Sequence, residues 1–316
     1  MQKIAVVIPY FGKLPNYFNL YINSLKNTPY IDVLFFTDIV INEQLPSNFK
    51  VIPTTLPMLA ERIENSLGIK TNINHPIKLC DFKPTWGEVF REELQSYSHW
   101  GFGDIDVVYG DIPQFLPHNW QDKDIVSFLP YWLSGSLCII KNSPKMRTLY
   151  QQSRFWREAL ETSNHTAFDE CHHLYSDLRN GESIFELDDQ QSFTWVVKKS
   201  HLNGDIDAYF SEPVIKEKIY VREFINVAPG KVTLNDGKEV AYYHLICEKN
   251  LMSFELIEGQ VPETFIIDRQ GFHYQTHFHR PGYRVVKSIA GSGLFTVQQI
   301  SRGIRKFKRT FNLAQQ

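Results

Sequence analysis

Cysteine is scarce in this sequence of 316 residues, and charge of neither sign is in excess. The four cysteines are widely spaced and form no CxxC pair, which argues against a zinc ribbon or a small disulfide scaffold. A reducing cytoplasm is therefore the expected compartment. The formal net charge of −2 gives the chain as a whole no attraction to nucleic acid or to an anionic membrane. We expect no nucleic-acid partner.

Long hydrophobic runs are missing as well. No stretch reaches the roughly 18 apolar residues that a membrane span needs, and the N-terminal segment MQKIAVVIPYFG is too short and too interrupted for a signal peptide. With 43% hydrophobic and 14% aromatic residues, the composition is typical of a folded globular protein. The length predicts one catalytic domain, residues 1–255, and a short C-terminal appendage, residues 256–316.

Strand and helix patterns alternate within the first forty residues. Residues 3–9 form a β-branched run that ends at a proline, residues 17–26 place apolar side chains at helical spacing, and residues 31–38 are a second apolar run. Strand, helix, strand is the start of a βαβ unit, whose parallel strands are buried on both faces. The sequence therefore predicts an α/β fold with parallel strands.

Further elements are predicted along the rest of the chain. Helices are expected at residues 58–67, 86–95, 149–160 and 190–199, and strands at residues 124–129 and 135–140. Asp188 or Asp189 is expected to cap the last of these helices. Residues 220–243 are expected to form hairpins, with the turn signal NDG at residues 235–237.

Asp104, Ile105 and Asp106 form an acidic tripeptide that follows an aromatic, glycine-rich segment and precedes an apolar run. In an extended segment, residues i and i+2 point to the same side, so both carboxylates can converge on one cation. Mg²⁺ and Mn²⁺ take oxygen ligands and often complete their shell with substrate phosphates. The alternative is a turn cap, since the tripeptide is common and residues 205–207 repeat it in a polar loop. The context favours the first copy as the metal site.

Several segments occur in the order expected of a glycosyltransferase with the GT-A fold. They are IPYFG, LFFTD, KLCDFKPTWGEVF, WGFGDIDVVYGDI, WLSGSLCIIKNS, DDQQSF and YYHLICEK. From Lys3 to Lys249 the chain resembles bacterial transferases of capsule or lipopolysaccharide gene clusters, and more distantly the retaining galactosyltransferases of the glycogenin type. The resemblance implies a Rossmann-like mixed sheet flanked by helices. It also implies a nucleotide-sugar donor, in particular a UDP-sugar, a glycan or lipid-linked saccharide acceptor, and Mn²⁺ or Mg²⁺ as cofactor.

The resemblance assigns the nucleotide to the ends of the first two strands, at Pro9, Tyr10, Phe11, Thr37 and Asp38. Tyr10 or Phe11 would stack on the base, and Asp38 would accept a hydrogen bond from the ribose or the uracil. Ligands in α/β sheets bind beyond the carboxyl ends of strands, which favours Asp38 for this role. Packing in the core is the alternative for Phe11.

Lys78, Asp81 and Lys83 form a mixed-charge cluster ahead of the acidic tripeptide. Cationic groups there would neutralise the diphosphate, and Asp81 would bind a sugar hydroxyl. The alternative is a solvated helix start with local ion pairs. Gly135 lies in a segment that resembles the part of these enzymes where a small residue and a glycine adjoin the sugar, although this chain has serine where the glycogenin type has asparagine.

His244 and Lys249 resemble a late histidine and lysine of these enzymes. There the histidine is the third protein ligand of the metal and the lysine contacts phosphate, which implies Asp104, Asp106 and His244 as metal ligands here. Imidazole nitrogen is an acceptable ligand for Mn²⁺. From the residues alone, His244 could equally be a satisfied core or surface histidine.

Two mechanisms follow from the resemblance. Asp189 and Gln190 resemble an Asp-Gln pair that lies near the anomeric carbon in retaining members, and this favours retention. In an inverting enzyme, Asp169 or Glu170 would be the general base that takes the acceptor proton. A closed tetrahedral metal site at the neighbouring histidines is not expected, because their spacing does not fit one.

Other functions and a membrane contact are open at this stage. A sugar nucleotidyltransferase would also pair acids with a metal, but it typically has a glycine-rich basic loop after the first strand, where this chain has only one glycine and one lysine. A noncatalytic carbohydrate-binding module is a further alternative. The basic segment of residues 301–309 predicts an amphipathic helix that either contacts an anionic inner membrane or is solvated.

Overall fold

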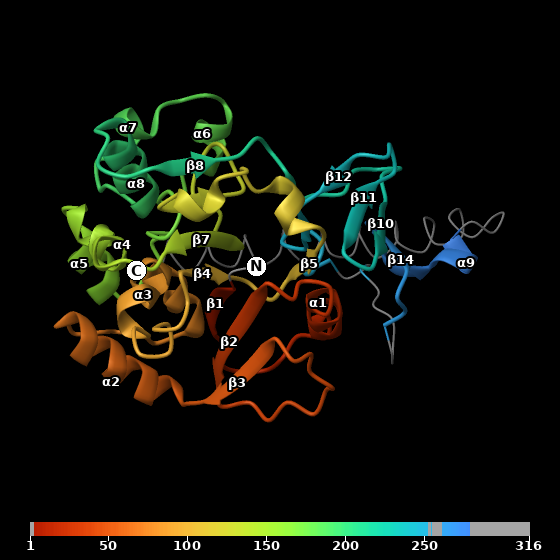
Figure 1. The fold of residues 1–316 in the computed structure, drawn as a ribbon, viewed down its shortest axis with the longest axis horizontal. Coiled ribbons are helices and arrows are strands. Elements are labelled where there is room, and N and C mark those ends of the chain that lie inside the picture. The colour runs from red at the N-terminus through yellow and green to blue at the C-terminus, as the bar shows by residue number, and fades with distance from the viewer. Residues whose placement is uncertain (1–2, 252–253, 255–260, 279–316) are drawn as a thin grey trace, which may run out of the picture.

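The computed structural model describes residues 3–251, 254 and 261–278 (Figure 1). The main sheet contains β1 (Ile4–Pro9), β2 (Ile31–Thr37), β3 (Phe49–Pro53), β4 (His99–Gly103), β6 (Ile125–Ser127), β7 (Leu137–Lys141) and β8 (Ala208–Phe210). The strand order is β3-β2-β1-β4-β7-β6-β8. β7 is antiparallel to both of its neighbours, and every other neighbouring pair in this sheet is parallel. The sheet is therefore mixed, with a parallel half at its N-terminal side.

Both faces of the main sheet are covered by other elements. Alternate side chains of β1 point to opposite faces, so that Ala5 and Val7 belong to one buried cluster and Ile4, Val6 and Ile8 to another. The first cluster includes residues of α2 (Leu56–Leu67), α3 (Trp86–Val89) and α8 (Phe193–Leu202), and the second includes residues of α1 (Phe18–Leu25). Burial on both faces explains why the strands are continuous apolar runs.

The remaining helices of the described residues are short. They are α4 (Pro144–Thr148), α5 (Trp156–Glu161), α6 (Tyr175–Arg179), α7 (Ile184–Leu187) and α9 (Gln275–Phe278), with 3₁₀ helices η1 (Pro76–Thr85), η2 (Ile112–Phe115), η3 (Trp120–Asp122) and η4 (Leu149–Gln152). The helix predicted for residues 149–160 is interrupted at Ser153, whose hydroxyl accepts from the N–H of Phe155 at 3.2 Å. Such local bonds compete with the helix. The helix predicted for residues 86–95 ends at Val89 and continues as turns.

The N-cap of α8 is Ser192, and neither Asp188 nor Asp189 caps this helix as predicted. Ser192 Oγ accepts from the N–H of Trp195 at 3.4 Å. Asp188 instead accepts from the N–H of Ser192 at 2.7 Å, through Oδ2. The buried Asp188 carboxylate therefore fixes the residue that caps the helix.

Two smaller sheets complete the described chain. One consists of β5 (Val107–Tyr109), β13 (Tyr242–His244) and β9 (Ile215–Lys216), and the other of β12 (Glu239–Val240), β11 (Lys231–Leu234), β10 (Ile225–Ala228), β14 (Phe265–Asp268) and β15 (Gly271–Tyr274). The predicted turn at residues 235–237 joins β11 to β12, with Gly237 at a φ of 90° that favours glycine. Figure 1 shows β10, β11 and β12 on the side of the molecule where β5 lies.

The predicted fold class is confirmed, because the chain forms an α/β structure with a mixed sheet flanked by helices. The division into residues 1–255 and 256–316 stays a prediction. The basic segment of residues 301–309 lies outside the described residues. Within the described residues, none of the helices has both the length and the apolar character that crossing a membrane requires.

Asp32, near the amino end of β2, is buried and held by three donors. The ammonium groups of Lys3 and Lys50 lie 2.8 and 3.0 Å from its carboxylate, and the hydroxyl of Tyr97 donates at 2.7 Å. Burial raises the pKa of Asp32, but the three donors outweigh this effect and hold the pKa below its ordinary value. The native protein therefore favours the ionised form of this group.

Because the pKa of Asp32 is lowered in the folded protein, this residue stabilises the fold at neutral pH and stabilises it less in acid. Its contribution is complete above the pKa of the unfolded chain, about 3.9, and is lost as the pH falls through the lower folded value. We expect wild type to have a larger free energy of unfolding than Asp32→Asn at pH 7, and the difference to narrow below about pH 4.5. Urea titrations at several pH values measure this. A difference that does not change with pH would contradict the prediction.

Candidate functional site

The acidic tripeptide lies in a bend between the main sheet and the three-stranded sheet. Asp104 directly follows β4 and Asp106 directly precedes β5. The two acids therefore lie between strands, whereas the sequence predicted that both lie in one extended segment. The Asp104 N–H donates to the carbonyl of Ser136 at 3.2 Å, and the Asp106 carbonyl accepts from the N–H of Leu245 at 2.8 Å. Ile105 is buried in the core between them. Backbone bonds and a core anchor thus hold the bend.

His244 reaches the acids through the pairing of two strands. β13 is antiparallel to β5, and His244 lies opposite Val107, the residue that follows Asp106. One ligand atom each of Asp104, Asp106 and His244 lies within 4.8 Å of the others. Asp106 Oδ1 lies 3.4 Å from His244 Nε2. The three residues that the sequence assigned to a metal are therefore neighbours in space.

Lys249 adds a cation to this cluster. It lies in the turn after β13, where its N–H donates to the carbonyl of Leu245 at 2.9 Å. Its Nζ forms an ion pair with Asp106 Oδ2, while 26% of the side chain remains exposed. The ammonium therefore neutralises a buried acid, and the lysine side chain is still partly exposed.

The charges of this cluster shift one another's pKa values. Burial lowers the pKa of His244, but the carboxylates of Asp106 and Glu217 outweigh that effect and raise it to about 10. Burial raises the pKa of Asp106, yet His244 and Lys249 hold it well below its ordinary value. His244 Nδ1 lies 3.6 Å from Glu217 Oε1, and Arg179 contacts the other oxygen of Glu217 at 2.5 Å. A cation bound through the imidazole would have to replace its proton.

The donor set fits a divalent cation. Asp104 and Asp106 supply carboxylate oxygens and His244 supplies a ring nitrogen, a combination that suits Mn²⁺. Both ring nitrogens of His244 are buried and make no hydrogen bond within the part of the chain described, which is uncommon for buried polar atoms. The side chain of Asp104 is 32% exposed, so one side of the cluster is open to a substrate. These residues could hold a divalent cation.

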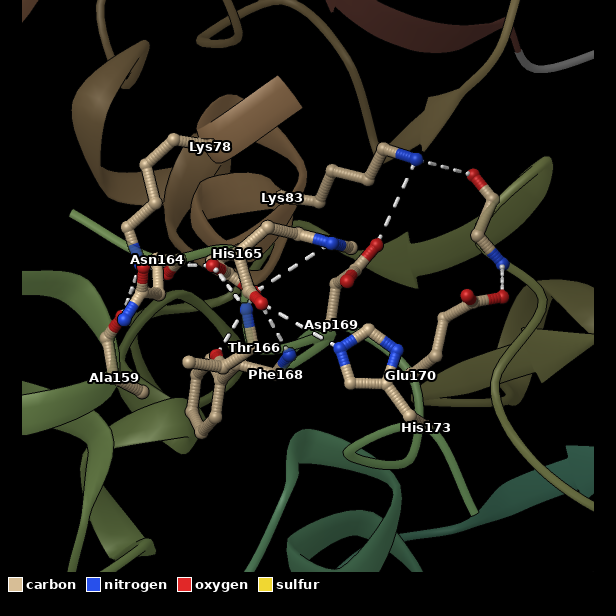
Figure 2. Close-up of polar contacts among 12 residues, drawn as sticks. Lys78, Lys83, Ala159, Asn164, His165, Thr166, Phe168, Asp169, Glu170 and His173 are labelled. Carbon is tan, nitrogen blue, oxygen red and sulfur yellow. Dashed lines mark hydrogen bonds and ion pairs between the residues drawn. The ribbon is translucent and has the colours of Figure 1, made fainter. Parts of the chain in front are cut away.

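Lys83 connects the acidic tripeptide to the carboxyl group of Asp169 and to the backbone of Gly135. Its Nζ donates to Asp104 Oδ1 at 2.8 Å and to the Gly135 carbonyl at 2.9 Å, and lies 3.6 Å from Asp169 Oδ2. Figure 2 shows Lys83 extended toward Asp169, with Glu170 alongside. The Gly135 N–H donates to Glu170 Oε1 at 3.0 Å, and a Cβ at this position would lie 2.9 Å from that oxygen. A side chain at Gly135 would therefore push the carboxylate away.

Asp169 is buried and Glu170 is half-buried, so neither is a fully exposed base at the surface. Burial raises the pKa of both groups, and that of Asp169 well above its usual range, although the ammonium of Lys83 opposes the effect. Both oxygens of Glu170 accept hydrogen bonds, one from the Gly135 N–H and the other from the hydroxyl of Tyr175 at 2.7 Å. Asp169 is 2% exposed. Asp169 is therefore shielded from solvent, whereas Glu170 is half-buried and hydrogen-bonded through both oxygens.

Lys78 and Asp81, which were expected beside the donor, instead form a buried ion pair under a loop. Their side chains are 1% and 0% exposed, and Lys78 Nζ lies 2.8 Å from Asp81 Oδ2. Lys78 also donates to the carbonyls of Ala159 and Asn164, at 2.5 and 2.8 Å (Figure 2). Asp81 accepts from the N–H and the hydroxyl of Thr166, each at 3.0 Å. The pair thus fixes the loop and leaves neither charge exposed to a ligand.

The predicted nucleotide residues lie at the carboxyl ends of β1 and β2. Tyr10 is half-buried and stacks on Phe35 with ring centroids 5.9 Å apart, whereas Phe11 is buried in the core. Pro9 is the last residue of β1. Thr37 and Asp38 line a cleft of about 550 Å³ whose other walls are largely apolar. The remaining lining residues are Ile39, Val40, Ile41, Leu45, Val51, Pro53, Thr54, Thr55 and Met58. Tyr10 is therefore the aromatic side chain of this pair that is open to a ligand.

Asp189 and Gln190 are exposed on the segment before α8. The backbone carbonyl of Asp189 accepts from Arg154 Nη2 at 3.0 Å, and Gln190 Oε1 contacts His172 Nδ1 at 2.7 Å. The hydrogen bonds and ion pairs of the described residues do not link either side chain to Asp104. Their place near the anomeric carbon of a donor stays a prediction.

Two residues of this region, Glu217 and Tyr17, were not identified from the sequence. Glu217 Oε1 lies 3.6 Å from His244 Nδ1. Burial raises the pKa of Tyr17, and the nearby charges of Asp106 and Asp104 raise it further. Glu217 is in a charged, polar stretch and Tyr17 directly precedes the amphipathic helix α1, so neither has a local signal of a site. Their positions follow from tertiary packing.

Comparisons with known proteins give one family match and a distant structural likeness. A family model described as "Family of unknown function (DUF6625)" matches residues 6–276. No curated protein matches the sequence. The apo crystal structure of mouse Xyloside xylosyltransferase 1 is similar at 9% sequence identity and a TM-score of 0.39, over 78% of this chain and 98% of that chain. A likeness this distant assigns no activity to the chain.

Proposed function

The chain belongs to a family of unknown function, DUF6625, and we propose that it is a metal-dependent glycosyltransferase. Its donor is a nucleotide-sugar, in particular a UDP-sugar, and its acceptor is a glycan or a lipid-linked saccharide. The ordered segments between Lys3 and Lys249 that resemble GT-A glycosyltransferases support this proposal. The α/β fold with a mixed sheet is compatible with it.

One observation carries the proposal. Asp104, Asp106 and His244 bring their ligand atoms within 4.8 Å of one another at the carboxyl end of β4. In α/β sheets the crevice at the carboxyl ends of the strands is where ligands bind. Two carboxylates and an imidazole at that edge are suited to a divalent cation that also takes phosphate oxygens.

The leaving group is a nucleoside diphosphate, and its developing charge has to be neutralised. A bound Mn²⁺ or Mg²⁺ would supply positive charge to the diphosphate oxygens. Lys249 is the chain's own cation for the same task, because its ammonium adjoins Asp106 and its side chain is partly exposed. A lysine aimed at the leaving phosphate lowers the free energy of the charged transition state.

The nucleoside has a matching surface beside this cluster. Tyr10 is close enough to Lys249 and Asp106 for their charges to act on its pKa, which burial raises. Its ring can stack on a base, and Asp38 at the neighbouring strand end can accept from a ribose hydroxyl. Asp38 also lines the largely apolar cleft beside β3 and α2.

Retention of the anomeric configuration is part of the proposal. An inverting enzyme needs a base that the acceptor hydroxyl can reach. Asp169 is buried, and both oxygens of Glu170 already accept hydrogen bonds from Gly135 and Tyr175. In a retaining enzyme the leaving phosphate itself can assist the acceptor, so neither residue has to be free.

Thermal denaturation with nucleotide-sugars tests the proposed function. We expect a UDP-sugar with Mn²⁺ to raise the Tm, because a ligand that binds only the native state at a hundred times its Kd stabilises it by about 2.7 kcal/mol. GDP- and CMP-sugars serve as controls, and EDTA should remove the shift. A shift that survives EDTA would contradict metal dependence, and no shift with any nucleotide-sugar would contradict the function.

A further inference from the structure

The ammonium group of Lys83 has three oxygen partners at unequal distances. Its side chain is 9% exposed and its Nζ contacts Asp104, Asp169 and the carbonyl of Gly135. The contact with Asp104 is a hydrogen bond of 2.8 Å, whereas Asp169 is at 3.6 Å and is only an ion-pair neighbour. The ammonium is therefore nearer to one carboxylate but within reach of both.

Within the described part of the chain, one oxygen of the Asp169 carboxyl group has no hydrogen-bond partner in this arrangement. It is 2% exposed, and its Oδ1 is buried with no hydrogen-bond partner among the residues described. A buried carboxyl group without partners is costly, because it has lost water and gained nothing in exchange. Lys83 is the cation beside it. A small shift of Nζ away from Asp104 would bring it into hydrogen-bond range of Asp169.

A divalent cation at the acidic tripeptide would favour that shift. Asp104 would be both a ligand of the cation and the acceptor of the Lys83 hydrogen bond, so the two positive charges would compete for the same carboxylate and repel each other in a partly buried site. The carbonyl of Gly135 accepts from Lys83 at 2.9 Å and belongs to the backbone. It can therefore act as a fixed pivot while Nζ changes carboxylates.

We propose that Lys83 is a two-position counter-ion. It pairs with Asp104 when that carboxylate holds no cation, and with Asp169 when a divalent cation takes Asp104. This inference rests on the metal site of the proposed function. It makes Asp169 a positioning residue, which acts on the cation through Lys83 and does not contact the substrate.

A two-position Lys83 would change the affinity of the acidic tripeptide for a divalent cation. Lys83 opposes the cation at Asp104, and Asp169 reduces that opposition by offering the ammonium a second partner. Removal of the lysine should therefore tighten cation binding, and replacement of the Asp169 carboxyl group by an amide, which cannot take over the ammonium as a carboxylate can, should weaken it. The effect of Asp169 should depend on the presence of Lys83, since it acts only through that side chain.

Isothermal titration of the full chain with Mn²⁺ tests this inference. We expect Lys83→Met to bind Mn²⁺ about tenfold more tightly than wild type, because one competing charged hydrogen bond is removed. Asp169→Asn should bind several-fold more weakly. In the Lys83→Met background, Asp169→Asn should change the affinity by less than about twofold, since a double-mutant cycle isolates the coupling. Lys70→Met, which removes a surface ion pair with Glu64, is the matched control and should leave the affinity unchanged.

The outcomes separate the two proposals. If wild type binds no Mn²⁺, the proposed function fails and this inference fails with it. If wild type binds Mn²⁺ but Lys83→Met does not bind more tightly, the counter-ion inference alone is overturned. The same holds if Asp169→Asn weakens binding equally in both backgrounds. Melting curves recorded for each variant identify any that has not folded, and each single variant tests the inference by itself.

Discussion

Asp106→Asn is expected to lower the Mn²⁺-dependent release of UDP from a UDP-sugar by about a hundredfold to a thousandfold, the range seen when one electrostatic stabiliser of a transition state is removed. Asparagine preserves the shape of the side chain but removes its charge. Asp106 is 3% exposed, approaches His244 at 3.4 Å and pairs with Lys249. The substitution therefore weakens the cation site and also releases the lysine from its partner.

The second copy of the tripeptide provides a matched control. Asp207 occupies the equivalent position in residues 205–207, and its carboxylate pairs with Lys123 at the surface, at 2.7 Å. Asp207→Asn should leave UDP release unchanged. Equal activity of Asp106→Asn and wild type, with both folded by circular dichroism, would contradict the role of the first copy. Equal losses in the two variants would show that the effect is not specific to the site.

Asp81→Ala is expected to lower the free energy of unfolding by about 3 to 5 kcal/mol, the cost of removing one partner of a buried ion pair. Lys78 would keep its charge at 1% exposure without a counter-ion. The substitution also orphans the N–H groups of Thr166 and Phe168, which donate to Asp81 at 3.0 and 2.9 Å. Buried donors that lose their acceptor add to the loss.

Urea denaturation followed by circular dichroism measures this effect. Glu161→Ala is a suitable comparison, because Glu161 forms an exposed ion pair with Arg157 at 3.5 Å, and exposed pairs contribute little. We expect a far smaller change for Glu161→Ala than for Asp81→Ala. If the two variants lose similar amounts of stability, the buried pair does not anchor the loop. Any UDP release that folded Asp81→Ala retains would agree with a structural role.

The parts of the fold that were predictable are those with a local pattern. β1, α1 and β2 each have an apolar run of the right length and spacing, and the structure contains all three. β3 (Phe49–Pro53) was missed, because only its first residue is buried and its place in the sheet comes from pairing with β2. The interruption at Ser153 depends on one side-chain bond that apolar spacing does not reveal.

The candidate site also contains residues that a local sequence pattern predicts and contacts that it does not. Asp104 and Asp106 were singled out by the tripeptide and its context, and His244 by the order of segments. The partners of Lys83 were not predictable, because its contacts with Asp104 and Gly135 span 21 and 52 residues of sequence. The charges of Lys78 and Asp81 suggested a ligand site, but a sequence does not reveal that two opposite charges are buried together.

The central claim is that Asp104, Asp106 and His244 together bind one divalent cation. Anomalous diffraction from crystals of the full chain grown with Mn²⁺ and UDP tests it most directly. We predict a manganese peak within coordination distance of a carboxylate oxygen of each acid and a ring nitrogen of the histidine. Manganese bound elsewhere, or no anomalous peak at these three residues, would contradict the claim.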